Sequence, residues 1–205
     1  NDHYLFAITG NYLTIFDVQN PSQPIVLSKA GPLAGNPNEI SLYGDRVYIT
    51  SVKEGIHIFD ISNLTSPLEV GSYIIATWPT HIMATNGLLY VTYSDMTLKV
   101  LDDTNLSRVV EVASLPIETA SNYNISKLKL VGNFITFTTP SEFVVVTVTD
   151  PRNPQIVTRY AQSQTIRELA VLGNFAYLCG GNSGITILNI SDPANPNFAG
   201  SISTT

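Results

Sequence analysis

A block that recurs every 42 to 45 residues constrains this 205-residue chain more than any other sequence feature. Each copy holds an apolar, strand-like run followed by an Asx residue, and in most copies by prolines. The Asx residues are Asn20, Asn63, Asn105, Asp150 and Asp192, at spacings of 43, 42, 45 and 42 residues. Repetition at one period indicates supersecondary units that bury their apolar faces against their neighbours.

A second block repeats in phase with the first and predicts a β-hairpin, because a turn dipeptide precedes a β-branched or aromatic run. Its clearest copies cover residues 44–49, 86–91, 132–137 and 173–178. Together the two blocks predict four short strands per repeat, which in the last copy lie near 166–171, 175–179, 184–190 and 197–203. Capped segments with a 3.6-residue apolar period are missing from the sequence, so almost no helix is expected. Four strands in about 42 residues are typical of a β-propeller blade.

The sequence therefore predicts an all-β fold, a β-propeller domain or part of one, with repeats at about 1–34, 35–76, 77–119, 120–162 and 163–205. The first copy starts at residues that align with 44–49, so its blade lacks the inner strand and nineteen strands are expected in all. Two alternatives stay open: a five-bladed ring with one three-stranded blade, and a piece of a longer propeller. In the second case, edge strands or missing blades offer a route to assembly.

The Asx-Pro pairs have a local structural explanation. Asn20-Pro21, Asp150-Pro151 and Asp192-Pro193 each follow a predicted strand. An Asx side chain accepts a nearby backbone N–H, and proline fixes φ and cannot donate to a further ladder. We expect these residues, and the strand-end acids Asp17, Asp60 and Asp102, to shape turns rather than bind ligands.

The strand-end motifs resemble a known repeat. Residues 15–18 (Ile-Phe-Asp-Val), 58–61 (Ile-Phe-Asp-Ile) and 187–193 (Ile-Leu-Asn-Ile-Ser-Asp-Pro) are similar to LVIVD repeats, a bacterial and archaeal β-propeller repeat. The third copy departs from the motif by an Asp102-Asp103 pair, and the fourth by Thr147 in place of the acid. The resemblance implies a propeller and, from the family's usual setting, an exported or surface protein.

Composition excludes some partners. Only 13% of residues are charged, about half the usual share, and the net charge is −6. Nucleic acid is therefore not an expected partner, since phosphate binding needs clustered Lys and Arg. The longest apolar run falls short of the roughly 18 residues that a transmembrane helix needs, so membrane insertion is not expected. Few lysines and many Thr and Asn residues favour an extracellular, cell-surface or periplasmic location. The single cysteine, Cys179, is expected to be a small buried apolar residue.

The candidate site lies where the inner strands begin, at the predicted channel mouth. Equivalent pairs there differ from copy to copy while their surroundings repeat, as a binding surface or a drifting solvated rim would show. They are Asn38-Glu39, Thr80-His81, Ser126-Lys127 and Arg167-Glu168. Trp78 and Tyr123, the latter in the longest departure from the period, are aromatic candidates for stacking on a sugar or a peptide.

Catalytic signals are weak. The three histidines, His3, His57 and His81, have no metal-ligand spacing, and no phosphate-binding, nucleophile-elbow or EF-hand motif occurs. We expect no cofactor and no metal. The leading hypothesis is a non-catalytic propeller that binds a protein or glycan, or acts as a scaffold. The alternative is a propeller hydrolase or lyase whose acid and base are channel-mouth residues such as Glu39, His81 and Glu168.

Overall fold

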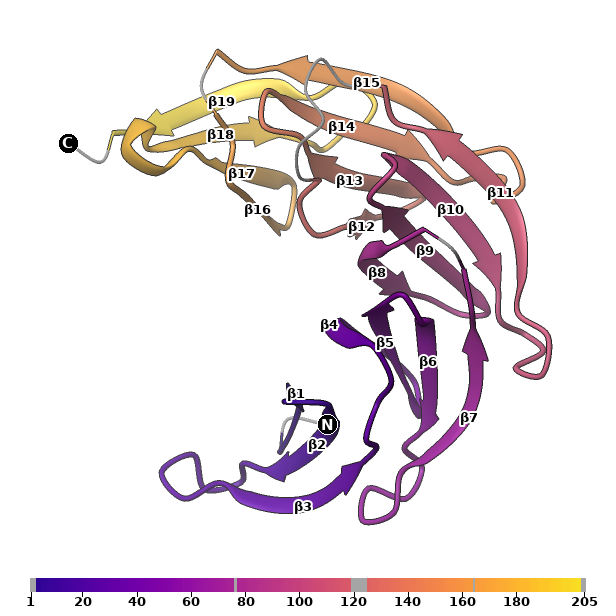
Figure 1. Cartoon of the computed structure of the whole chain (residues 1–205). Coiled ribbons are helices and arrows are strands. Elements are labelled where there is room, and N and C mark those ends of the chain that lie inside the picture. The colour runs from indigo at the N-terminus through magenta and orange to yellow at the C-terminus, as the bar shows by residue number, and fades with distance from the viewer. Residues whose placement is uncertain (1–2, 76, 119–124, 164, 204–205) are drawn as a thin grey trace. The chain divides into compact units, whose positions relative to one another are not determined.

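The fold is all-β, as the sequence predicts. The computed structural model describes residues 3–75, 77–118, 125–163 and 165–203 (Figure 1). In these ranges the chain forms nineteen strands and a single 3-10 turn, Gly181–Ser183, with no α-helix. The strands form one three-stranded and four four-stranded sheets, in which consecutive strands are neighbours. Each sheet is one propeller blade.

The strands fall into sheets in chain order. The first sheet holds β1 (Tyr4–Thr9), β2 (Tyr12–Asp17) and β3 (Ile25–Ala30), and the second holds β4 (Asn36–Tyr43), β5 (Arg46–Val52), β6 (Gly55–Asp60) and β7 (Leu68–Tyr73). The third holds β8 (Pro79–Ala84), β9 (Leu88–Tyr93), β10 (Thr97–Asp102) and β11 (Val110–Pro116). The fourth holds β12 (Lys129–Val131), β13 (Phe134–Thr138), β14 (Glu142–Thr147) and β15 (Gln155–Ala161). The fifth holds β16 (Glu168–Leu172), β17 (Phe175–Cys179), β18 (Ile185–Asn189) and β19 (Asn197–Ile202).

The first sheet lacks the strand that corresponds to β4, as expected, but its sequence alignment was wrong by one residue. Tyr4 pairs with Asp17 as Arg46 pairs with Asp60, so Tyr4, and not His3, is the equivalent of Arg46. The error arose because the polar residues before β1 match the turn dipeptide of the second repeat in more than one register. Strand register is set by the ladder, which a short polar match does not specify.

Alternation of side chains buries both faces of the central strands. On β5, Val47 and Ile49 pack into a core with Leu13 and Ile15 of the first sheet. Tyr48, between them, points to the other face and packs into a second core with Leu89, Val91 and further residues of the third sheet. A strand covered on both faces reads as a continuous apolar run, which is why these segments lack a clear polar face.

The Asx residues shape turns in every copy. Backbone N–H groups two residues on donate to the side chains of Asn20, Asn63, Asn105, Asp150 and Asp192, and the N–H three residues on donates to each backbone carbonyl. Asp17, Asp60 and Asp102 accept in the same way from the residue two positions later. The predicted structural role of these acids is confirmed by their hydrogen bonds.

The described residues divide into two compact units. Unit 1 comprises Asn1–Asp95 and Lys99–Glu111, and unit 2 comprises Met96–Leu98 and Val112–Thr205. Unit 2 has its own core, in which Phe143 and Val145 of the fourth sheet pack with Leu178 and Leu188 of the fifth. Within the described part of the chain, no helix is long and apolar enough to cross a membrane.

Candidate functional site

Two equivalent β-bulges shape the candidate site of unit 1. On β4, Pro37 pairs with Ser51 and Glu39 with Thr50, so Asn38 is the extra, unpaired residue. On β8, Pro79 pairs with Tyr93 and His81 with Thr92, so Thr80 is the extra residue. A bulge redirects side chains and interrupts the ladder, and bulges are common beside functional sites. We call Asn38, Glu39, Thr80 and His81 the entry site, because they lie where β4 and β8 begin.

Hydrogen bonds fix the entry site across two neighbouring sheets. The Asn38 amide nitrogen donates to the carbonyls of Pro79 and Thr80, each at 3.3 Å. Its amide oxygen accepts from the Thr50 hydroxyl at 2.8 Å. The hydroxyls of Thr80 and Thr92 lie 2.9 Å apart. The bulge residues are therefore held by their own sheet and, through Asn38, by the next one.

The carboxylate and the imidazole of the entry site lie within hydrogen-bonding distance of each other. Glu39 Oε2 lies 2.5 Å from His81 Nδ1, with side-chain exposures of 10% for Glu39 and 24% for His81. The carboxylate fixes the imidazole orientation and directs Nε2 away from Glu39, as in carboxylate–histidine pairs that act in acid–base chemistry. The sequence placed these two residues at equivalent positions, and the structure brings them into contact.

Of the two aromatic candidates, Trp78 and Tyr123, the structure describes only Trp78. Trp78 lies directly before β8, its carbonyl accepts the Ser94 N–H at 2.9 Å, and its side chain is 49% exposed. Its backbone is therefore fixed while its ring stays accessible, two residues before Thr80 in the chain. Tyr123 lies outside the described residues.

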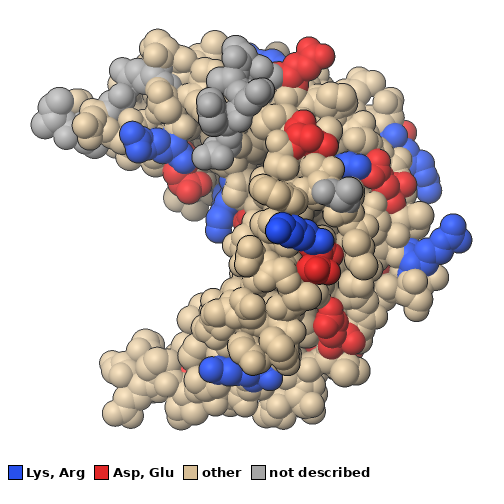
Figure 2. Space-filling view, in the orientation of Figure 1, with Lys and Arg blue, Asp and Glu red and all other residues tan. Residues whose placement is uncertain are grey.

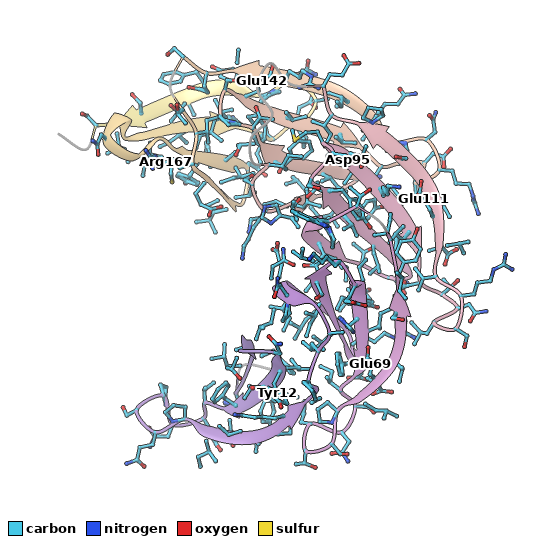
Figure 3. All side chains as sticks on the ribbon, viewed as in Figure 1. Tyr12, Glu69, Asp95, Glu111, Glu142 and Arg167 are labelled. Atoms are coloured by element: carbon cyan, nitrogen blue, oxygen red, sulfur yellow. The ribbon has the colours of Figure 1, made fainter. Side chains whose placement is uncertain are left out.

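The remaining candidates belong to unit 2. Lys127 and Glu168 occupy positions equivalent to Glu39 and His81, and both are exposed. Arg167 precedes β16, where Figure 3 labels it, and a Cβ placed on Gly181 would lie 3.0 Å from its Nε. The guanidinium therefore packs over the Gly181 backbone. Arg167 also lines a cavity of about 340 Å³ with Ser126, Thr138, Thr165 and other residues.

Two other residues singled out in the sequence have clear surroundings. His57 is buried on β6, with Nδ1 2.7 Å from Glu69 Oε1 on β7, which agrees with a blade-face role. Cys179 was expected to be buried but is partly exposed, and it pairs in register with Glu168. In the described ranges, His, Cys, Asp and Glu side chains form no group of three that could hold a metal.

The structure adds a polar cluster that is not among the candidate residues predicted from the sequence. Asp103 is fully buried and contacts Tyr48 and Arg46 of the neighbouring sheet. The signal was present in the sequence, because Asp103 is the residue by which the third copy departs from the repeat. Asp103 stands at a position that is apolar in the other copies.

The chain belongs to the LVIVD repeat family, whose model matches residues 3–29, 34–74 and 165–204. These segments cover more than half of the chain and lie in the first, second and fifth copies. No curated protein matches the sequence.

Solved structures show the same fold at low sequence identity. A functionally unknown protein from Desulfotomaculum acetoxidans has a TM-score of 0.76 at 13% identity, with 95% of this chain and 63% of that protein covered. The periplasmic gluconolactonase of Pseudomonas aeruginosa has a TM-score of 0.72 at 14% identity, with 98% and 66% covered. The β-propeller domain of Cps50 (Swd1) from Myceliophteria thermophila has a TM-score of 0.75 at 12% identity, with 98% and 69% covered. The chain thus spans less than two thirds of the first two proteins' length.

Proposed function

We propose that this chain is a non-catalytic binding module that takes a protein or glycan segment at the entry site of unit 1. The observation that supports the proposal most is the pair of bulges. They present Asn38, Glu39, Thr80 and His81 in a geometry fixed across two sheets. Fixed polar groups lower the ordering cost of binding, and backbone bulges open the edge of a site to a ligand.

Trp78 supports a glycan as the segment that binds. A half-exposed indole two and three residues before Thr80 and His81 offers an apolar face for stacking, and those residues offer polar groups for hydroxyls. The low density of charge is consistent with an uncharged ligand. On the face in Figure 2 most side chains are uncharged, and the acidic and basic residues are scattered within each unit.

The intrinsic fluorescence of the protein tests this proposal directly, since Trp78 is the only tryptophan of the chain. We expect cello-, chito- or xylo-oligosaccharides, or peptides selected on the immobilised protein, to shift its emission with saturation. His81→Ala and Asn38→Ala should each weaken the affinity about tenfold, as loss of one good polar contact does. Leu172→Ala, at an exposed residue of unit 2, is the matched control. An emission unchanged by every probe contradicts the proposal.

The Glu39–His81 pair favours a hydrolase or lyase activity as a second candidate function. A solved structure of similar fold is a periplasmic gluconolactonase, so this type of fold is compatible with such chemistry. The test uses glucono-1,5-lactone and measures the rate above the uncatalysed reaction between pH 5 and 9. A catalytic role predicts a rate that His81→Ala removes and that Glu39→Gln shifts in its pH profile. A rate equal to background in the unaltered protein rejects this candidate.

We place the module outside the cytoplasm, in the periplasm or on the cell surface. Support comes from the low Lys and Arg content, 10 residues of 205, and from the periplasmic relative of similar fold. Fractionation of the native host with an antibody against the chain tests the location. Recovery with cytoplasmic markers contradicts it.

A further inference from the structure

A polar cavity lies in unit 1 at the opposite ends of β4 and β8 from the entry site. It has a volume of about 390 Å³, within the range of small-molecule sites. Two hairpin turns and the end of β6 border this open cavity. Its lining is Tyr43, Gly44, Asp45, Arg46, Tyr48, Asp60, Ser62, Thr85, Asn86 and Gly87.

A buried carboxylate supports one wall of this cavity. Asp103 has no exposed surface, and its Oδ2 accepts from the Tyr48 hydroxyl at 2.5 Å and from Arg46 Nη1 at 3.5 Å. Both donors line the cavity. The second oxygen, Oδ1, is buried and has no hydrogen-bond partner among the described residues. Asp103 thus holds the guanidinium and the phenol in place and has acceptor capacity to spare.

The repeat shows that folding does not require this cluster. The residues equivalent to Asp103 are Val18, Ile61, Val148 and Ile190. The equivalence is fixed by one hydrogen bond that all five copies share: the backbone N–H of this residue donates to the carbonyl of the residue before the strand equivalent to β5. The residues equivalent to Arg46 are Tyr4, Leu88, Phe134 and Phe175. Apolar side chains fill both positions elsewhere in the same chain.

Packing energetics do not account for the two charges. A buried ion pair is often no more stabilising than apolar residues of similar volume, and a half-satisfied carboxylate is worse. Yet the second sheet has a cation, Arg46, and the third an anion, Asp103, where the other repeats have apolar or aromatic residues. The two residues meet beside the cavity. This arrangement fits groups that are placed for a ligand.

The lining selects the chemistry of that ligand. Asp45, Asp60 and the supporting Asp103 outnumber Arg46, so an anion is disfavoured. The lining offers the carboxylates of Asp45 and Asp60 as acceptors, and the Arg46 guanidinium and the Asn86 amide as donors. Hydroxyl groups, which donate and accept at once, match such a lining. Tyr43, 43% exposed, adds an aromatic surface.

We propose that this cavity binds an uncharged polyhydroxylated compound of mono- or disaccharide size, held by Arg46, Asn86 and the carboxylates of Asp45 and Asp60. Asp60 then has a ligand role in addition to its turn-forming bond from the Ser62 N–H, which was not expected from the sequence. The site is separate from the entry site, so the proposal does not rest on the proposed function.

The experiment titrates the whole chain with glucose, galactose, mannose, maltose and myo-inositol, and follows backbone amide shifts by NMR. We expect at least one of these compounds to shift the amides of Gly44, Asn86 and Gly87 with saturation. Putrescine and citrate serve as cationic and anionic probes. Shifts produced by putrescine or citrate alone, or by none of the probes, overturn the proposal.

Variants built from the chain's own repeats separate binding from folding. Tyr48→Phe combined with Asp103→Val introduces residues of the first repeat, and Arg46→Leu introduces the residue of the third. Both variants should fold and should lower the affinity at least tenfold, whereas Trp78→Ala should leave it unchanged. An affinity that both cavity variants retain also overturns the proposal. If no oligosaccharide or peptide changes the Trp78 emission but the cavity still binds its ligand, the proposed function is rejected and this proposal stands.

Discussion

At the scale of single residues, the contact between Tyr48 and Asp103 predicts a pH dependence. Burial, and then the hydrogen bond to Asp103, raises the pKa of Tyr48 to about 12. In the unfolded chain the pKa is about 10, so this residue contributes stability that is present below pH 10 and lost as pH rises towards 12. Urea unfolding at pH 9, 10, 11 and 12 should show a steeper fall of the unfolding free energy for the unaltered protein than for Tyr48→Phe. Equal slopes would contradict the expected shift.

The buried hydroxyl of Tyr93 predicts that its removal does not destabilise the protein, in contrast to removal of the Tyr48 hydroxyl. Tyr93 is 1% exposed, burial raises its pKa, and its hydroxyl has no hydrogen-bond partner among the described residues. Tyr93→Phe should therefore leave stability unchanged or raise it by about 1 kcal/mol, because a desolvated polar group is removed. Tyr48→Phe, which breaks a bond to a carboxylate, should lower it by about 1.5–3 kcal/mol. Thermal unfolding of the two variants at pH 7 compares them. A destabilised Tyr93→Phe would show that the hydroxyl has a partner.

The limits of sequence reasoning are clear for individual residues. Repeat alignment predicted that Glu39 and His81 are equivalent, and equivalent positions on adjacent blades are close in space. It did not predict their 2.5 Å contact, because side-chain direction at the entry site depends on the bulges at Asn38 and Thr80. Asp103 was visible as a departure from the motif. Its meaning required Arg46 and Tyr48, which lie 55 to 57 residues away in the chain and come near Asp103 because the second sheet packs against the third.

At the scale of strands and turns, two glycines limit how the third strand of a blade can begin. Gly55 and Gly184 have φ of 87° and 83°, and a Cβ on either would lie 2.0 Å from the carbonyl oxygen of Tyr73 or Ile202. Each therefore allows the outermost strand to approach closely. Gly55→Ala and Gly184→Ala should each destabilise the protein by at least about 2 kcal/mol, from positive-φ strain and the clash together.

Chemical denaturation measures this effect, and other glycines of the same chain provide controls. Gly10 and Gly132 have φ of 59°, and a Cβ on either would meet nothing within 4 Å. Their replacement by alanine should cost only about 1 kcal/mol, the penalty of the left-handed region. Similar losses at Gly55 and Gly10 would show that the close approach of Tyr73 contributes nothing.

Most strand positions could be predicted from sequence, whereas register could not. Period-two patterns and turn dipeptides placed the last four strands within two residues of β16, β17, β18 and β19. The first copy was misaligned by one residue, since a polar dipeptide alone does not fix a ladder. Bulges between β2 and β3, β6 and β7, β14 and β15, and β18 and β19 recur at one place in the blade. The residue that follows the extra one is Ser28, Gly71, Thr158 or Gly200, so a glycine marks only two of the four bulges.

At the scale of the whole molecule, each unit is a series of similar sheets with cores between neighbours. Each core draws on two adjacent sheets, and few charged side chains connect distant regions. Such repeat proteins approximate a sum of local terms and nearest-neighbour terms. Substitutions that do not share a core or a hydrogen-bond network should therefore act independently, even within one unit.

The entry site and the cavity offer a strict test of this independence, because β4 and β8 contribute to both. Arg46 pairs with Tyr43, which lies four residues along β4 from Glu39, a separation of ~13 Å at the usual strand rise. Their hydrogen bonds share no residue: His81 contacts Glu39, and Arg46 contacts Asp103. In a double-mutant cycle of His81→Ala and Arg46→Leu, the changes in unfolding free energy should add within about 0.5 kcal/mol. Urea unfolding of the four proteins at pH 7 provides the cycle. A coupling above about 1 kcal/mol would mean that the two ends of the strands form one cooperative network, and binding at one end would then alter affinity at the other.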